Sequence, residues 1–272
     1  MKTTVRGFKR LALAAGVFAV GLLLTACGSN NSSSKGNYTS ELKQSKQLTV
    51  GLEGTYAPYS YRKDGKLTGF EVDLSKAVAK KMNLKANFVP TKWDSLIAGL
   101  GSSKYDVVLN NIAETPERKK SYIFSTPYIY SRYALITKSG DKTINKLADV
   151  KGQKLAEGTG TNNEALAKKL GAKTVPSGDF TTSLALIRQG RVKGAINARE
   201  AWYAYAKSNS TKGLDYHQVS DSQAEPVHIS AMFNKKDTKL QAKFNKVLQQ
   251  LRKDGTLAKL SQKYFGENIT SK

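Results

Sequence analysis

The chain has 272 residues, a single cysteine and a formal net charge of +23, from 44 basic and 21 acidic side chains. This length is enough for a sizeable hydrophobic core, and one cysteine excludes a fold held by intrachain disulfides. The basic residues are spread along the chain and no nucleic-acid recognition motif stands out, so we expect a solvated charged surface and no nucleic-acid partner.

The first 26 residues have the pattern of a targeting segment. Basic residues come first, and Leu11 to Leu24 form an apolar core that is short for a membrane span. Small residues then precede Cys27 in a spacing that resembles a bacterial lipobox. We expect residues 1–26 to be a signal peptide and Cys27 to be lipidated, which would anchor the protein without a transmembrane helix. An ordinary secretory signal with an incidental cysteine is the alternative.

The segment that follows is rich in Ser, Asn and Gly, so residues 27–44 are predicted to be a flexible tether. Removing residues 1–26 takes away four basic residues and no acidic one, which leaves a charge of +19. Such a surplus on an exported protein suits anionic polymers outside the cell, such as cell-wall polyanions or mucus.

From residue 47 onward, short apolar segments alternate with amphipathic ones. Phe70, Leu74 and Val78 have the i, i+4, i+8 spacing of a helix stripe. The predicted elements are a strand at 48–53, a helix within 69–84, a strand at 86–90, a helix at 93–100 and a strand at 105–111. This order predicts a parallel α/β sheet.

A second series of the same kind begins after residue 138. We predict a strand at 154–158, a helix at 161–171 with Gly171 at its end, a helix at 180–190 and a strand at 192–197. The segment 239–266 predicts two helices that are broken at Asp254 and Gly255.

The two series contain matching stretches, 96–111 and 184–198. Each runs helix, glycine, basic residue, strand, asparagine, and the strands end at Asn110, Asn111 and Asn197. Ligands of open α/β sheets collect beyond the carboxyl ends of the strands. Two such ends that face one another predict a small-molecule cleft between two lobes.

At this point the chain resembles a known family, the solute-binding proteins of polar amino-acid ABC importers, over residues 45–268. The resemblance is carried by "GFEVDLSKAVAKKM", "YDVVLNNIAETPERKKSYIFSTPY" and "LRKDGTLAKLSQKYFG". "GLEGTYAPYSYRKDGKLTGFEVDL" and "TKWDSLIAGL" look most like the cystine-binding branch.

The resemblance implies a two-lobed, type II periplasmic-binding-protein-like α/β fold with two hinge strands. Lobe 1 would be discontinuous, made of 45–130 plus 226–270, and lobe 2 would be 131–225. The chain would cross between the lobes near 128–132 and 222–227.

The function that the resemblance implies is that of a lipid-anchored receptor on the outer face of a Gram-positive-like bacterial cell membrane. It would bind an amino acid, with cystine favoured, and deliver it to an ABC permease with its ATPase. Another polar amino acid (glutamine, glutamate or a basic one) is the alternative ligand. A basic surface adhesin for cell-wall polyanions, mucus or matrix is an alternative or additional function. We expect a monomer without cofactor, metal or enzymatic activity.

The resemblance also implies the ligand contacts. Arg118 in "TPERKK" would grip the ligand carboxylate through paired charge-assisted hydrogen bonds. Opposite it, a loop would present a helix N-terminus to the same group. Tyr56 and Trp93 would stack on the ligand side chain. The remaining predicted contacts are the backbone of Asn111 and Ala113, the loop residues Thr159, Gly160 and Thr161, and the strand end at Asn197.

The ammonium group of the ligand needs an acidic partner. The family commonly places an acid where this chain has Ala198, so we hypothesise that Glu53 takes this role, with Glu200 and Glu157 as further candidates. The chain has two histidines, and no catalytic set can be picked out of the sequence.

Overall fold

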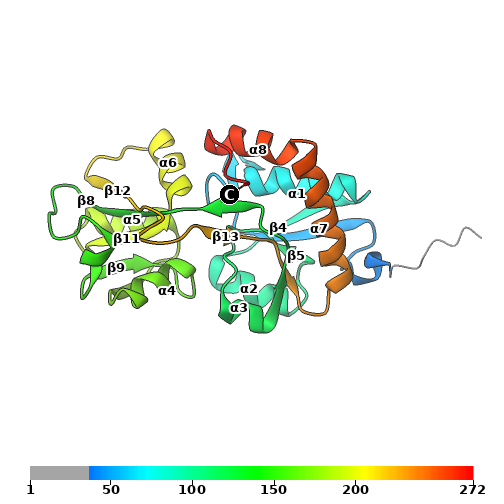
Figure 1. Ribbon diagram of the computed structural model, residues 1–272, viewed down its shortest axis with the longest axis horizontal. Coiled ribbons are helices and arrows are strands. Elements are labelled where there is room, and N and C mark those ends of the chain that lie inside the picture. Colours follow the sequence, from blue (N-terminus) through cyan, green and yellow to red (C-terminus); the bar gives the residue numbers. More distant parts are fainter. Residues whose placement is uncertain (1–36, 272) are drawn as a thin grey trace, which may run out of the picture. The chain divides into compact units, whose positions relative to one another are not determined.

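The computed structural model describes residues 37–271 (Figure 1). The predicted signal peptide and Cys27 lie outside the described residues. Within residues 37–271, no helix is both long and apolar enough to cross a bilayer.

Two five-stranded sheets form the centres of two lobes. The first lobe has the strand order β4-β1-β5-β14-β6. Its strands are β1 (Gln47–Leu52), β4 (Lys85–Pro90), β5 (Val107–Val108), β6 (Tyr122–Phe124) and β14 (Met232–Asn234). Its helices are α1 (Phe70–Lys81), α2 (Trp93–Gly101), α3 (Pro116–Ser121), α7 (Thr238–Lys253) and α8 (Thr256–Phe265). A short hairpin of β2 (Tyr61–Lys63) and β3 (Lys66–Thr68) belongs to this lobe.

The second lobe has the strand order β10-β9-β11-β8-β12. Its strands are β8 (Tyr133–Lys138), β9 (Lys154–Glu157), β10 (Lys173–Pro176), β11 (Gly194–Ala198) and β12 (Leu214–Gln218). Its helices are α4 (Asn162–Lys169), α5 (Phe180–Arg188) and α6 (Arg199–Ser208), with a 3-10 turn η2 (Leu147–Val150).

Two strands connect the lobes at their middle (Figure 1). β7 (Ile129–Ser131) and β13 (Val227–Ile229) pair antiparallel, with Ile129 opposite Ile229 and Ser131 opposite Val227. The predicted two-lobed fold with two hinge strands is therefore confirmed.

Both sheets are mixed, so the prediction of parallel sheets is wrong in part. β1 runs parallel to β4 and β5, but β14 enters antiparallel between β5 and β6 after the chain has returned through β13. In the second lobe, β8 and β12 add an antiparallel half. The chain leaves the first lobe after β6 and returns to it only at β14, so β14 pairs with strands that come much earlier in the sequence. The periodicity of a short segment does not reveal such a pairing.

The helices follow the predicted patterns. Phe70, Leu74 and Val78 of α1 are fully buried against the first sheet. At the end of α4, Gly171 has φ +81°, and the N–H groups of Gly171 and Ala172 donate to Lys168 and Ala167, which is a Schellman motif. The tail forms α7 and α8, divided at Asp254 and Gly255.

The predicted flexible tether 27–44 requires a correction in its described part. Residues Tyr38–Glu41 form a 3-10 turn, η1. The Tyr38 hydroxyl donates to the Met82 carbonyl at 2.9 Å, the Lys43 N–H donates to Asp106, and the Glu41 carboxylate accepts from the Leu240 N–H at 2.7 Å. Residues 38–43 are therefore part of the folded unit.

Candidate functional site

A cavity of about 80 Å³ lies between the lobes. It is found where β1, β5, β9 and β11 end, which is the sheet edge that the asparagine-terminated strands predicted. Its lining from the first lobe is Glu53, Thr55, Tyr56, Trp93, Asn110 and Asn111. Its lining from the second lobe is Ala156, Glu157, Gly158, Thr161, Asn162, Asn163, Ser177, Gly178, Asp179, Phe180, Ser183 and Asn197.

Hydrogen bonds cross the cleft and hold the lobes against one another. The Tyr56 hydroxyl donates to Asn197 Oδ1 at 2.6 Å, and Trp93 Nε1 donates to the Thr159 carbonyl at 2.8 Å. Arg118 Nη2 donates to the Gly160 carbonyl at 3.1 Å. These contacts tie the predicted aromatic and basic residues of one lobe to the predicted loop and to the strand end at Asn197 in the other.

Arg118 does not line the cavity, but it lies against the lining residue Trp93 and is only 7% exposed. Thr115 caps α3 by accepting the Arg118 N–H, and this fixes the start of the helix. The guanidinium also donates to the Ala113 carbonyl at 2.9 Å and lies 5.4 Å from the centroid of the Trp93 ring. Burial lowers the pKa of Arg118 to about 10, so the side chain stays charged at neutral pH.

Hydrogen bonds to the first turn of α4 fix the conformation of the loop that precedes this helix. Thr161 is the N-cap and accepts the Glu164 N–H at 3.0 Å, while the Gly160 N–H donates to the Glu164 carboxylate at 2.8 Å. Lys168 pairs with Glu164 at 2.7 Å. One amide of the predicted anion-binding loop therefore already has a carboxylate partner. Thr159 and Gly160 contribute carbonyls to the interlobe contacts and do not line the cavity.

The cavity is acidic, although the protein as a whole is basic. Glu53, Glu157 and Asp179 line it, and no lysine or arginine is among its lining residues. Burial raises the pKa of Glu53, against a hydrogen bond of 2.6 Å from Asn110, and the negative charges of Asp179 and Asp94 raise it further. Burial raises the pKa of Glu157 well above its ordinary value. Such a lining suits a ligand that carries an ammonium group.

Asn111 links the cavity to a buried carboxylate that sequence reasoning missed. Its φ is +50°, its side-chain oxygen is buried without a partner among residues 37–271, and its N–H donates to Glu71 at 2.7 Å. The hydroxyl of Tyr128, just before β7, donates to the same Glu71 oxygen at 2.5 Å. Glu71 lies beside the apolar stripe of α1, three residues before Leu74. This position next to buried residues was the one sequence signal that its carboxylate is buried. Through these two hydrogen bonds, Glu71 connects Asn111 at the cavity to Tyr128 at the hinge.

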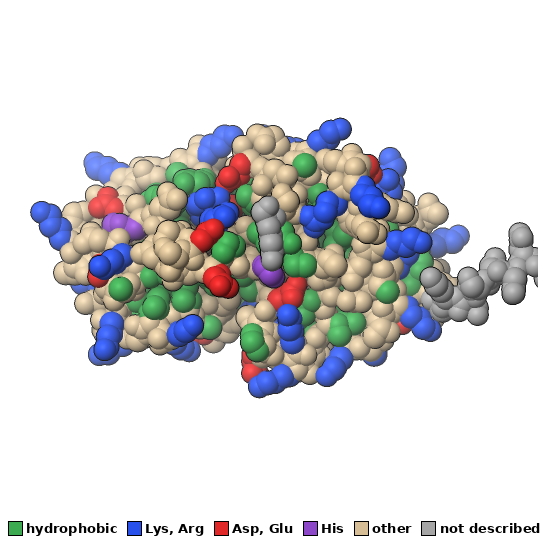
Figure 2. All heavy atoms as spheres, viewed as in Figure 1, with side chains coloured by type: hydrophobic (Ala, Val, Ile, Leu, Met, Phe, Trp, Pro, Cys, Tyr) green, Lys and Arg blue, Asp and Glu red, His purple; other side chains and the backbone are tan. Residues whose placement is uncertain are grey.

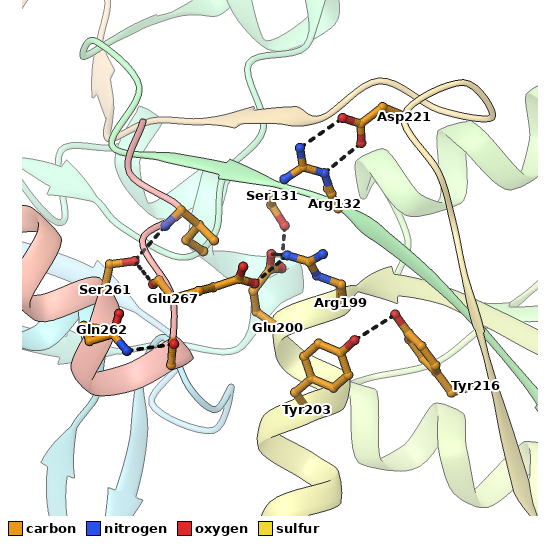
Figure 3. Close-up of polar contacts among 12 residues, drawn as sticks. Ser131, Arg132, Arg199, Glu200, Tyr203, Tyr216, Asp221, Ser261, Gln262 and Glu267 are labelled. Carbon is orange, nitrogen blue, oxygen red and sulfur yellow. Dashed lines mark hydrogen bonds and ion pairs between the residues drawn. The ribbon is translucent and has the colours of Figure 1, made fainter. Parts of the chain in front are cut away.

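A polar network lies behind the cleft, around the hinge (Figure 3). Arg199, the first residue of α6, pairs with Glu267 at 2.6 Å, and Ser131 of β7 donates to Glu200 at 2.9 Å. Arg132 donates two hydrogen bonds to Asp221, of 2.7 and 3.0 Å. Glu200 is therefore engaged at the hinge and does not line the cavity, in contrast to Glu53 and Glu157.

In the described part of the chain, no group of three or more His, Cys, Asp and Glu side chains could hold a metal ion. His217 shares a hydrogen bond of 2.8 Å with Thr137 in the second sheet, and the His228 ring packs edge-on against Tyr130 at the hinge. Both histidines thus lie in structural contacts.

Comparisons with known proteins agree with this architecture. The sequence profile of the bacterial extracellular solute-binding proteins, family 3, matches residues 48–267. A probable amino-acid ABC transporter-binding protein of Haemophilus influenzae is 38% identical over 255 residues, which cover 93% of this chain and 98% of that protein. The L-cystine-binding protein TcyA of Bacillus subtilis is 36% identical over 255 residues, covering 91% and 94%.

Two solved structures have similar sequence identity to this chain but differ in how well they superimpose on it. An ancestral arginine-binding protein bound to glutamine matches with a TM-score of 0.76 at 34% identity, covering 82% of this chain and 100% of that one. The L-cystine solute receptor of Neisseria gonorrhoeae in the unliganded open conformation has a TM-score of only 0.58 at 37% identity, covering 87% and 100%. A lower score at higher identity is expected when the lobes are apart in one protein and in contact in the other.

Proposed function

The chain belongs to the bacterial extracellular solute-binding proteins of family 3, and from this premise we propose that it is the cystine receptor of an amino-acid ABC importer. The family and the relatives described above are solute-binding proteins, not enzymes. The receptor would bind cystine in the cleft, close its lobes on it and deliver it to a permease and its ATPase.

The observation that carries the proposal is the charge distribution in the cleft. One buried arginine, Arg118, lies against the lining residue Trp93, and three acids line the cavity. Cystine has two carboxylates and two ammonium groups, and Tyr56 and Trp93 provide rings that suit a sulfur-bearing chain. Glutamate fits this acidic lining less well because it carries a net negative charge, whereas cystine carries none. A basic amino acid fits the same charges and is the alternative ligand.

We assign roles as follows. Arg118 exchanges its hydrogen bond with the Gly160 carbonyl for the ligand carboxylate, and Glu53 accepts the ammonium group. Tyr56 and Trp93 cover the side chain. The remaining contacts come from the backbone of Asn111 and Ala113 and from Thr161 and Asn197.

Closure would be a hinge movement about β7 and β13, in which the ligand favours the closed form because only that form contacts it from both lobes. The proposed boundaries of the moving parts are 45–130 plus 226–270 for one lobe and 131–225 for the other. We further propose that Cys27 carries a lipid that holds the receptor, as a monomer, at the outer face of the membrane.

Thermal melting against a panel of amino acids tests the proposal. A chain that starts at residue 36 contains the complete folded unit and is suitable for the measurement. A ligand at 100 times its Kd adds about 2.7 kcal/mol, which corresponds to about 5–10 °C for a protein of this size. Cystine should give this shift, and Arg118→Ala should abolish it. Lys119→Ala is the matched control, because Lys119 is exposed and paired with Glu114. Absence of a shift with every amino acid would refute the receptor function.

The basic surface favours a second function, binding to anionic polymers outside the cell. Lysine and arginine side chains are distributed over the visible face of both lobes (Figure 2). Such a surface leaves the cleft free, so the two functions are compatible.

A further inference from the structure

A second hollow of about 640 Å³ lies beside the cavity, and we name it the outer groove. The first lobe contributes residues 55–58, the β2–β3 hairpin and the end of α8, and the second lobe contributes the start of α5 and much of α6. Thr55, Tyr56 and Phe180 line both the cavity and the outer groove. The two spaces are therefore neighbours, divided by these shared side chains.

The outer groove has the opposite charge to the cavity. Its lining includes Arg62, Lys63, Lys207 and Lys263 and no Asp or Glu, whereas the cavity lining includes three acids and no base. A ligand that spans both spaces would be recognised by its charges: an ammonium group belongs in the cavity and a carboxylate belongs in the groove.

Two of the four basic residues are free to take a ligand. Lys263 pairs with Asp73 at 2.8 Å, and Arg62 donates to the Gly65 carbonyl at 2.9 Å. The side-chain ammonium groups of Lys63 and Lys207 have no hydrogen-bond or ion-pair partner among residues 37–271. Lys63 is in β2 of the first lobe and Lys207 is in α6 of the second, so a carboxylate that contacts both would favour closed lobes.

Five aromatic side chains contribute to the remaining walls. Tyr56, Tyr61, Phe180, Tyr205 and Tyr264 line the outer groove. Aromatic rings cover aliphatic chains well and make favourable contacts with sulfur. The volume of the groove lies within the range of about 300–1,000 Å³ that is usual for small-molecule sites, whereas that of the cavity lies below it.

We propose that the outer groove is a second ligand subsite, which binds the distal, carboxylate-bearing end of an elongated amino-acid ligand whose head occupies the cavity. Disulfide-linked amino acids are the chemical class that fits best, because a sulfur-containing chain would pass the shared aromatic side chains and end in a second amino-acid group. Its carboxylate would contact Lys63 and Lys207, and its ammonium group would point out of the groove to solvent. The inference rests on the proposed receptor function. It predicts that the protein discriminates between ligands by length and by distal charge.

Isothermal titration with three probes tests the subsite: cystine, cystine monoamide with one carboxylate neutralised, and S-methylcysteine, which ends before the groove. The variants are Lys63→Gln, Lys207→Gln and the double substitution. Lys246→Gln on α7 is the matched control, because Lys246 is exposed and lines neither space.

The double substitution should raise the Kd for cystine about three- to tenfold, since each exposed charge pair contributes modestly. The Kd for S-methylcysteine should not change, and the monoamide should lose affinity for wild type but little more for the double variant. The cystine effect should shrink in about 1 M salt, where exposed charges are screened.

The failures of the two proposals can be told apart. If the double variant and wild type bind cystine equally, or if wild type binds S-methylcysteine as tightly as cystine, the subsite is wrong while the receptor function stands. Binding of arginine without binding of cystine would also overturn the subsite. If none of the probes and no other amino acid binds, the receptor function itself fails, and the subsite fails with it.

Discussion

At the scale of single residues, Glu53 is the acid whose substitution should most affect the ligand ammonium. Loss of a charge-assisted hydrogen bond of about 1.5–3 kcal/mol should make Glu53→Gln bind about 10- to 100-fold more weakly in titration calorimetry. Burial raises the pKa of Glu53, so this carboxylate takes up a proton at a higher pH than an exposed glutamate does. As the pH is lowered, the affinity of the wild-type protein for the ligand should therefore begin to fall at a higher pH. Glu117→Gln is the control, since Glu117 lies on the exposed face of α3. Unchanged affinity in Glu53→Gln would shift the role to Glu157 or Asp179.

Glu71 makes a separate prediction about stability and pH. Burial raises its pKa to about 7, against hydrogen bonds from Tyr128 and the Asn111 N–H, whereas the unfolded chain has a pKa of about 4.3. Between these values the native state binds more protons than the unfolded state, so the contribution of Glu71 to the free energy of unfolding falls as the pH rises. Glu71→Gln cannot titrate there. It should therefore gain stability relative to wild type, on the order of 3 kcal/mol, from pH 4.5 to 7.

Urea unfolding at several pH values measures this difference. Glu117→Gln should instead stay parallel to wild type over the same range. A constant offset between Glu71→Gln and wild type would contradict the raised pKa.

Six of the residues that the sequence analysis assigned to the ligand lie at the cavity. Glu53, Tyr56, Trp93, Asn111, Thr161 and Asn197 line the cavity. Arg118 was placed at the cleft, but its bond to the Gly160 carbonyl depends on how far the lobes close, and no local pattern encodes that distance. Asp179 was missed because, in sequence, it is only a helix cap; the second lobe brings it to the cavity.

At the scale of elements, the start of α1 depends on Gly69. Its φ is +132°, and an added Cβ would lie 2.2 Å from the Tyr59 carbonyl oxygen. Gly69→Ala should therefore cost about 2–4 kcal/mol in free energy of unfolding, because both the backbone strain and the clash must be relieved. Gly65→Ala in the β2–β3 turn is the matched control: its φ is +74°, but nothing lies within 4 Å of the added Cβ, so it should cost about 1 kcal/mol. Urea unfolding measures both changes in free energy of unfolding. Equal values for Gly69→Ala and Gly65→Ala would show that small shifts of the backbone relieve the clash at Gly69.

Helices and strands differed in how far the sequence predicted them. The stripe of α1 and the caps of α4, α7 and α8 are local signals, and the helices lie where those signals placed them. The strand predicted at 105–111 shrinks to β5 at residues 107–108. There, Asp106 accepts the N–H groups of Lys43 and Thr49 through its side chain, which is an interaction across the fold.

At the scale of the whole molecule, the family resemblance supplied the connection of the lobes, and periodicity did not. Repeated strand–helix units predict a parallel arrangement, but β14 is antiparallel to β5 because the chain returns through the hinge. The same return puts Glu267, after α8, beside Arg199 of α6 (Figure 3). Contacts between segments so distant in sequence decide where the lobes meet.

The net charge makes the last prediction, and salt dependence tests it. The chain has a formal charge of +23, and lysine and arginine side chains are spread over the visible face of both lobes (Figure 2). Binding to a polyanion such as dextran sulfate should therefore weaken at least about tenfold between 50 and 500 mM salt, as the Debye length shortens. Binding of S-methylcysteine should stay within about twofold, because the cavity lies between the two lobes, where charges are screened less than on the surface. The Lys63→Gln, Lys207→Gln double variant removes only two of the basic residues, so it should bind the polyanion almost as wild type does. Polyanion binding that ignores salt, or that disappears in this double variant, would show that the diffuse surface charge is not its cause.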